Sequence, residues 1–185
     1  MKFLVAVFAL LVAFPAAASA AGELDAPAGA VVLTVTGKIK QINREKFDPV
    51  RDGFIAFHER EFDRAVEFDR AMLEEIGMEE AEIDFDGWEG PIRFQGPRLI
   101  DVLNEAGWRK GSRITTLALD GFGTKISNYD IKAHDWILAT RGNGKPFGIG
   151  QRGPLWLVYD PPGDRKADKK EEGQWPWAIF LIEVH

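Results

Sequence analysis

The sequence predicts a single α+β domain that consists mostly of β-strands. Two observations predict it: many short segments rich in β-branched and aromatic residues, and only two or three short helical segments between them. The length supports the same conclusion, because 185 residues are enough to bury one hydrophobic core. No internal repeat divides the chain, so we expect one domain.

Eight segments have the alternating pattern or the β-branched content of strands. They lie at 31–42, with a bend expected at Gly37, and at 66–68, 82–85, 114–119, 124–126, 136–140, 155–159 and 177–184. Asn143-Gly144 is typical of a hairpin turn. The segment 160–174 reads as a charged loop without an apolar face. The segment 47–66 has two interpretations, a loop with a helical turn or an extended hairpin.

Helices are predicted at three places. Asp69 is a typical N-cap for a short helix at 70–76, which Gly77 ends. Leu99, Val102 and Leu103 recur at helical spacing in a second helix, which Gly107 ends. Asp130 is expected to open a further helical turn.

Residues 1–20 have the features of a secretory signal peptide. Lys2 supplies the positive charge, an unbroken apolar run extends from Phe3 to Phe14, and Pro15 ends it. Ala18-Ser19-Ala20 matches the small-residue site at which such peptides are cleaved. The alternative is an uncleaved membrane anchor. The apolar run disfavours it, because it is shorter than the about 20 residues of a membrane-spanning helix.

Cleavage after Ala20 leaves 165 residues, which is 185 minus 20. We expect a signal peptide at 1–20, a flexible linker at 21–30 and the folded domain at 31–185, in a protein exported to the periplasm. Without Lys2 the chain has 22 basic residues (23 minus 1) and 29 acidic residues, a net charge near −7. Such an acidic chain without a dense basic run is unsuited to bind nucleic acid.

Three blocks of sequence, in this order and spacing, resemble the sulfite-oxidase-type molybdopterin-binding fold. They are W-E-G-P-I-R-F-Q-G at 88–96, continued by P-R-L-I-D-V-L at 97–103 and A-G at 106–107; I-L-A-T-R-G-N-G-K-P at 137–146; and G-P-L-W-L-V-Y at 153–159. The resemblance covers the chain from about Val31 to its C-terminus. It implies an oxidoreductase-like domain built around a pterin pocket.

Two departures from that family decide what the resemblance implies for function. The family's molybdenum-ligating cysteine would fall near Asp84, but this chain has no cysteine. A carboxylate is a hard oxygen donor and does not replace a thiolate. The family's third block commonly has an arginine that helps to hold the anionic tail of the cofactor, and Trp156 stands there. A bound molybdopterin is therefore not expected, and no covalent cofactor, metal or catalytic residue is predicted.

The chain is more similar to a small secreted branch of this fold, which includes PruR-like periplasmic pterin-binding proteins. The similarity rests on the signal peptide, V-L-T-V-T-G-K-I at 32–39, F-D-R-A-M-L at 68–73, L-A-T-R at 138–141 and the block at 153–159. It implies a pterin as ligand. It also implies, as partner, the periplasmic domain of a membrane-bound cyclic-di-GMP enzyme.

A pterin site needs an aromatic face for stacking, a carboxylate that accepts from the N–H edge and a donor for the oxo group. The residues in or near the three blocks that offer these groups are Trp88, Arg141, Arg152, Trp156, Tyr159, Trp175, Trp177, Asp84 and Asp86. Each also has a plain structural interpretation. The tryptophans could be core, the arginines could lie on the surface, and the two aspartates could face solvent.

Three functional hypotheses follow. The first is a non-catalytic periplasmic receptor for a small pterin, which signals to a membrane-bound partner. The second is a molybdopterin-dependent oxidoreductase that works without a protein thiolate. The third is a structural interaction module with a vestigial pocket. The segment 47–66 either covers the pocket or docks a partner. His58 and His134 are far apart in sequence and lack the spacing of zinc ligands.

Overall fold

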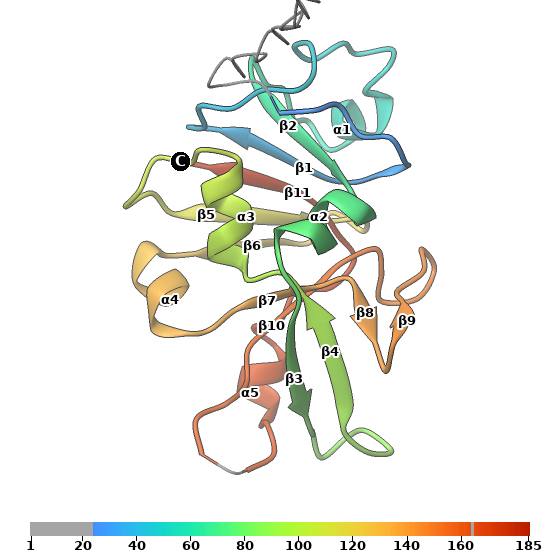
Figure 1. The fold of residues 1–185 in the computed structure, drawn as a ribbon, viewed down its shortest axis with the longest axis vertical. Helices are drawn as coiled ribbons and strands as arrows, with labels where there is room; N and C mark the ends of the chain where they lie inside the picture. The colour runs from blue at the N-terminus through green and yellow to red at the C-terminus, as the bar shows by residue number, and fades with distance from the viewer. Residues whose placement is uncertain (1–23, 164) are drawn as a thin grey trace, which may run out of the picture.

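The computed structural model describes residues 24–163 and 165–185, which form three β-sheets and five short helices (Figure 1). The strands are β1 (Val31–Gly37), β2 (Ala65–Asp69), β3 (Glu79–Ile83), β4 (Ile92–Gly96), β5 (Ile114–Ala118), β6 (Gly123–Ile126), β7 (Ile137–Ala139), β8 (Arg141–Gly142), β9 (Lys145–Pro146), β10 (Trp156–Val158) and β11 (Ile179–Val184). The helices are α1 (Gly53–Phe57), α2 (Arg70–Ile76), α3 (Leu99–Glu105), α4 (Asn128–Ala133) and α5 (Lys169–Glu172). This confirms the predicted α+β, mostly β class.

The largest sheet has five strands in the order β2-β1-β11-β5-β6. β1 pairs with β11 in parallel, and the other neighbours are antiparallel. β1 ends at Gly37, so the predicted continuation to residue 42 is wrong. Gly37 has a φ of +89°, and a Cβ atom there would lie 2.2 Å from the carbonyl oxygen of Val184. Only glycine allows the chain to turn so close to the end of β11.

The other two sheets, β3-β4-β8-β9 and β10-β7, form the part of the molecule below the large sheet in Figure 1. β4 passes so close to β7 that a Cβ atom on Gly96 would lie 2.3 Å from the carbonyl oxygen of Leu138. β8 and β9 are joined by Asn143 and Gly144, with φ values of 51° and 76°. Two successive positive φ values are typical of a type I′ turn, which confirms the predicted hairpin.

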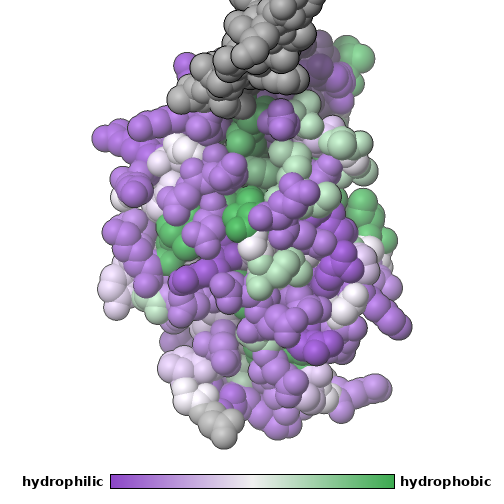
Figure 2. Space-filling view, viewed as in Figure 1, coloured by the Kyte–Doolittle hydropathy of each residue, from purple (hydrophilic) through white to green (hydrophobic). Residues whose placement is uncertain are grey.

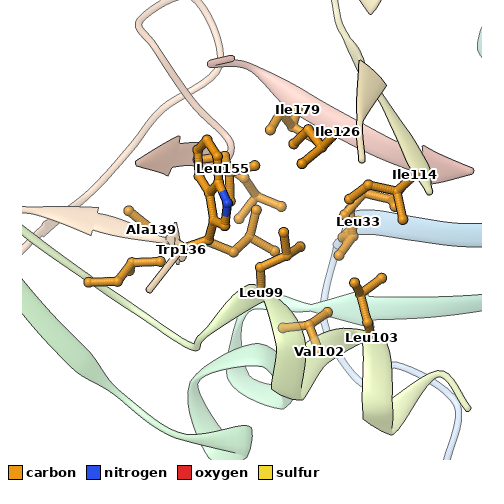
Figure 3. Close-up of a cluster of buried hydrophobic side chains, with 14 of the residues drawn as sticks. Leu33, Leu99, Val102, Leu103, Ile114, Ile126, Trp136, Ala139, Leu155 and Ile179 are labelled. Carbon is orange, nitrogen blue, oxygen red and sulfur yellow. The ribbon is translucent and has the colours of Figure 1, made fainter. Parts of the chain in front are cut away.

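The core forms between α3 and the large sheet. Figure 3 shows Leu99, Val102 and Leu103 of α3 directed toward strand residues such as Leu33 and Ile114. All five of these side chains are fully buried. The helical spacing of the three α3 residues therefore identified both the helix and the face that it buries.

Some predicted boundaries need correction. α4 is capped by Ser127, whose side chain accepts from the backbone N–H of Asp130, so Asp130 is the third helical residue of a capping box rather than its opening residue. β3 lies at 79–83 and not at 82–85. β11 begins at Ile179 because Ala178 has a φ of 55°, which strand geometry excludes.

The charged segment 160–174 also contains structure that the sequence did not predict. Asp168 and Glu171 form a capping box for the single turn α5. Ala167 is buried and pairs with Phe85 in an isolated parallel bridge. The middle of this segment is therefore attached to the rest of the domain through Ala167.

The segment 47–66 contains the short helix α1, as the first of its two interpretations predicted. Ile55, Phe62 and Ala65 form a small separate cluster, with Phe47 and Phe180 packed against it. Figure 1 places α1 beside β2, at the opposite end of the molecule from α5.

The face in Figure 2 is mainly hydrophilic, with small hydrophobic areas between the polar side chains. No helix in the described part of the chain is long and apolar enough to cross a membrane. The predicted signal peptide lies outside the described residues. Of the predicted linker, Leu24 packs against the core and Gly29 donates its N–H to Asp69 Oδ2 at 2.6 Å.

Replacing Asp69 tests the cap of α2. Asp69 Oδ1 accepts from the N–H of Met72 at 2.9 Å, while Oδ2 holds Gly29, so one carboxylate satisfies two backbone donors. We expect Asp69→Ala to lower the free energy of unfolding by about 1–2 kcal/mol, measured by urea denaturation. The control is Asp63→Ala, an exposed residue, for which we expect a change below about 0.5 kcal/mol. Equal stability of Asp69→Ala and the native protein would contradict this role.

Candidate functional site

A cleft with a volume of about 940 Å³ lies among β3, the end of α4 and the loop that precedes α5. We call it the Asp84 cleft. Its lining residues are Glu82, Asp84, Pro91, Ala133, His134, Asp135, Asp160, Pro161, Pro162, Gly163, Arg165 and Lys166. The volume is at the upper end of the range of about 300–1,000 Å³ that is usual for small-molecule sites. More than half of these residues are charged or titratable, so the cleft favours a polar ligand.

Backbone pairing brings the walls of this cleft together. The N–H of Ala167 donates to the carbonyl oxygen of Asp84 at 2.8 Å, beside the bridge between Phe85 and Ala167. Residues more than eighty positions apart therefore lie next to each other in a fixed register. Arg165 and Lys166 reach the cleft for this reason.

Among the carboxylates of the cleft, Asp84 is the one best placed to accept a hydrogen bond from a ligand. Its Oδ2 atom lies 3.0 Å from Lys166 Nζ, while Oδ1 is buried and has no hydrogen-bond partner among the described residues. Lys166 also lies 4.0 Å from the exposed carboxylate of Asp86. The hydrogen bond with Asp84 raises the pKa of Lys166, although its half-exposed side chain makes this ion pair weak. A buried carboxylate oxygen without a donor is costly and can be satisfied by a ligand N–H.

An aromatic pair forms part of the same wall. The ring of His134 stacks on Tyr159, with centroids 4.1 Å apart and planes inclined by 17°. Tyr159 is buried, its pKa is raised by that burial, and Trp175 meets it edge-on at 5.6 Å. The packing behind His134 holds its imidazole as a fixed flat surface at the cleft.

Arg165 supplies the guanidinium of the cleft. Its two terminal nitrogens bind the Glu171 carboxylate at 2.8 and 2.6 Å. This contact raises the pKa of Arg165 and lowers that of Glu171. Because Glu171 is also part of the α5 capping box, the arginine is anchored to the loop that it belongs to.

The nine residues predicted from the sequence fall into three groups. Asp84 lines the Asp84 cleft, and the other three members of its group contact lining residues directly or through one neighbour: Asp86 lies 4.0 Å from Lys166, Tyr159 stacks on His134, and Trp175 packs against Tyr159. Trp88, Trp156, Arg152 and Trp177 form a second group, in which Trp88 meets Trp156 at 5.7 Å and the Arg152 guanidinium lies over the rings of Trp156 and Trp177 at 4.5 and 5.7 Å. Arg141 stands apart from both.

Burial separates the tryptophans of these groups. Trp156 and Trp175 are 3% and 2% exposed, and the indole N–H of each has no partner among the described residues, whereas Trp177 is 40% exposed. Trp175 and Trp177 therefore do not share one environment, although a strand would have put them on one face.

Arg141 joins α2 to β8. Its Nε and Nη2 atoms donate to Glu74 at 2.8 and 2.9 Å, and Thr140 Oγ1 donates to the same carboxylate at 3.0 Å. The hydrogen bond from Arg141 is the main reason why the pKa of Glu74 is lowered. Arg70, one residue beyond the α2 cap, donates to the carbonyl oxygen of Thr140 at 2.5 Å.

Sequence reasoning missed His134, Arg165 and Lys166. His134 has no metal-ligand partner in sequence, and the run from 166 to 172 reads as a solvated loop. The capping box at 168–171 is the signal that could have identified an ordered turn there. No group of three or more His, Asp or Glu residues in the described ranges is arranged to hold a metal ion.

Among solved structures, the chain is similar to the sulfane dehydrogenase SoxCD from Paracoccus pantotrophus, with a TM-score of 0.53 and 16% sequence identity. The match covers 84% of this chain and 38% of that chain, so this protein spans well under half of its neighbour's length. No protein-family model and no curated protein sequence matches. The likeness shows a distant molybdopterin-oxidoreductase-like fold.

The pair between Glu74 and Arg141 predicts a pH-dependent contribution to stability. Arg141→Ala leaves the half-buried Glu74 carboxylate with Thr140 alone, and we expect a loss of about 1–3 kcal/mol in the free energy of unfolding at neutral pH. Because the pKa of folded Glu74 is lowered, the pair contributes fully above the ordinary carboxyl pKa and is lost as the pH falls through the folded value.

Urea denaturation of both proteins at about pH 7 and at about pH 3 checks this sign. The difference between native protein and Arg141→Ala should shrink at the acidic pH. Arg93→Ala is the matched control, because Arg93 is an exposed residue of neighbouring β4 whose side chain has no bonding partner in the described chain. A difference that grows on acidification would refute the assignment.

Proposed function

We propose that this protein is a non-catalytic, exported receptor for a small pterin, belonging to the small secreted branch of the sulfite-oxidase-type fold. The observation that carries the proposal is the Asp84 cleft, in which a carboxylate with an unpartnered oxygen, a stacked imidazole and a guanidinium line one cavity. A pterin is a flat polar bicycle with an amino-oxo edge, and these are the three kinds of group that it requires.

Each part of the cleft has a role in this proposal. Asp84 accepts from the N–H groups of the pterin edge, once Lys166 has moved aside to admit the ring. His134, supported from behind by Tyr159, offers the flat face for stacking. Arg165 donates to the oxo group through its Nε–H, because Glu171 uses only the two terminal nitrogens.

The same residues do not fit a molybdenum centre. The resemblance implies that the family's thiolate position falls near Asp84, a hard oxygen donor, and no cysteine occurs anywhere in the sequence. Trp156, at the position of the family's tail-binding arginine, is buried against Phe94 and Trp88. Redox chemistry is therefore not part of the proposed function.

The likeness to a sulfane dehydrogenase supports a second candidate, a molybdopterin-dependent oxidoreductase without a protein thiolate. The two candidates differ in metal content. Elemental analysis of protein purified from its native compartment would show stoichiometric molybdenum for an oxidoreductase and none for a simple pterin receptor.

Pterin binding can be tested by isothermal titration with tetrahydrobiopterin, and then with pterin and lumazine as a matched pair. Lumazine has an oxo group in place of the 2-amino group, so it leaves the Asp84 carboxylate without that donor. We expect pterin to bind at least about tenfold more tightly than lumazine, because an unpaired buried acceptor is costly. Asp84→Asn should remove this preference, while Asp63→Asn, outside the cleft, should keep it.

Absence of binding at millimolar concentrations of all three compounds, with the protein folded, would end the proposal. If Asp84→Asn leaves pterin binding unchanged, the pterin remains the ligand but binds elsewhere, and the group around Arg152 and Trp177 is the next candidate site.

Signalling to a membrane-bound cyclic-di-GMP enzyme through its periplasmic domain is the further part of the proposal. A receptor that reports occupancy must bind its partner differently in its free and loaded states. We expect the affinity for such a domain to change at least about fivefold on addition of the pterin, measured by biolayer interferometry. Equal affinity in both states would exclude a signalling role.

A further inference from the structure

A second cleft, of about 380 Å³, lies where β1 and β11 end and β5 begins. We call it the basic cleft. Four cationic side chains line it, together with an amide and an imidazole: Lys38, Arg109, Lys110, Arg113, Asn128 and His185. None of its lining residues is an aspartate or a glutamate. This is unusual in a chain whose formal net charge is −6.

The four cations have no counter-charge. Within the described ranges, none of their side chains forms an ion pair or a hydrogen bond, and all four residues are exposed. Other arginines of this chain are paired, such as Arg44 with Asp52 and Glu67. Grouped cations without carboxylates produce a local positive potential that attracts anions.

The backbone holds these cations at fixed spacing. The N–H of Arg109 donates to the carbonyl oxygen of Lys38 at 2.9 Å, and the N–H of His185 donates to that of Arg113 at 3.0 Å. Between them, Ser112 donates its N–H to the carbonyl oxygen of Arg109 at 3.1 Å and closes a turn. Gly111 has a φ of +91° at the third position of this turn, as a type II turn requires. The cleft is therefore preorganised by main-chain contacts that do not involve the charged groups.

The imidazole and the amide complete the lining of the cleft. His185 Nε2 lies 2.8 Å from Thr115 Oγ1, which fixes the imidazole beside the cations. The Oδ1 atom of Asn128, which is an acceptor and would not bind an anion, is buried without a hydrogen-bond partner among the described residues, so only the amide NH2 group of this residue could donate to a phosphate. A terminal carboxylate on His185 would offset one of the four positive charges and would still leave a net charge of +3.

We propose that the basic cleft binds a phosphate or pyrophosphate group. Guanidinium groups match phosphate oxygens in bidentate geometry, and the two arginines and two lysines together suit a group with more than one negative charge. The group belongs either to a soluble phosphorylated compound or to an anionic lipid headgroup. The site is separate from the Asp84 cleft, since Asn128 begins α4 at the basic cleft and Ala133 ends it at the other. The proposal does not depend on pterin binding.

Isothermal titration of the purified protein with sodium pyrophosphate and with inorganic phosphate tests for a soluble source. The salt concentration should be about 0.1 M, which screens distant charges beyond about 10 Å. The triple variant Arg109→Gln, Lys110→Gln, Arg113→Gln should bind at least about tenfold more weakly. The matched triple variant Lys46→Gln, Arg51→Gln, Lys145→Gln removes the same total charge from exposed positions elsewhere, and its affinity should change less than about twofold.

Vesicle sedimentation tests for a lipid source. Vesicles of phosphatidylcholine alone are compared with vesicles that also contain phosphatidylglycerol, using the same two triple variants. Binding that needs the anionic lipid and is lost in the first triple variant alone assigns the site to a headgroup. Lys38→Gln, at the opposite wall, gives an independent readout if the triple variant unfolds. No binding of phosphate, pyrophosphate or anionic vesicles, or an equal loss in both triple variants, would overturn the proposal.

Discussion

The parallel pairing of β1 with β11 is the constraint on which the rest of the structure depends. It joins segments near the two ends of the described chain in the middle of a five-stranded sheet. Gly37 is required where β1 leaves this pairing, because no side chain fits against Val184. The pairing also sets the platform on which α3 buries its leucines, and it brings Lys38 and His185 together at the same end of two neighbouring strands. The position of the core, the register of the large sheet and the basic cleft therefore all depend on the pairing of β1 with β11.

The lower sheets depend on a second close approach, that of β4 to β7 at Gly96. Beside this crossing, Phe94 and Trp156 pack edge to face at 4.9 Å, and Trp88 joins them. These aromatic contacts bury Trp156 in the core. The fold is distantly similar to that of a sulfane dehydrogenase, and the interior around Trp156 is packed as core. The open cavity lies beside this core, around Asp84.

The two clefts differ in chemistry in a way that separates their ligands. The Asp84 cleft has charges of both signs and an aromatic surface, and its cations are paired with carboxylates. It suits a neutral polar ring with both donors and acceptors. The charged side chains that line the basic cleft have one sign and form no ion pair with the described residues, so this cleft suits an anion. The short helix α4 connects them, which provides a direct structural link between the two proposed ligands.

Local patterns determined much of this protein from the sequence alone: the fold class, the cap at Asp69, the buried face of α3 and the turn at Asn143. These features depend on neighbours within a few residues, whose preferences short sequence patterns contain. Tertiary structure alone decided where β1 stops, that Arg141 pairs with Glu74, and that His134 and Arg165 join Asp84. Each of these features depends on contacts between residues that are distant in sequence. Pairing between remote segments leaves no periodic pattern in the sequence of either segment, so it cannot be predicted from local patterns.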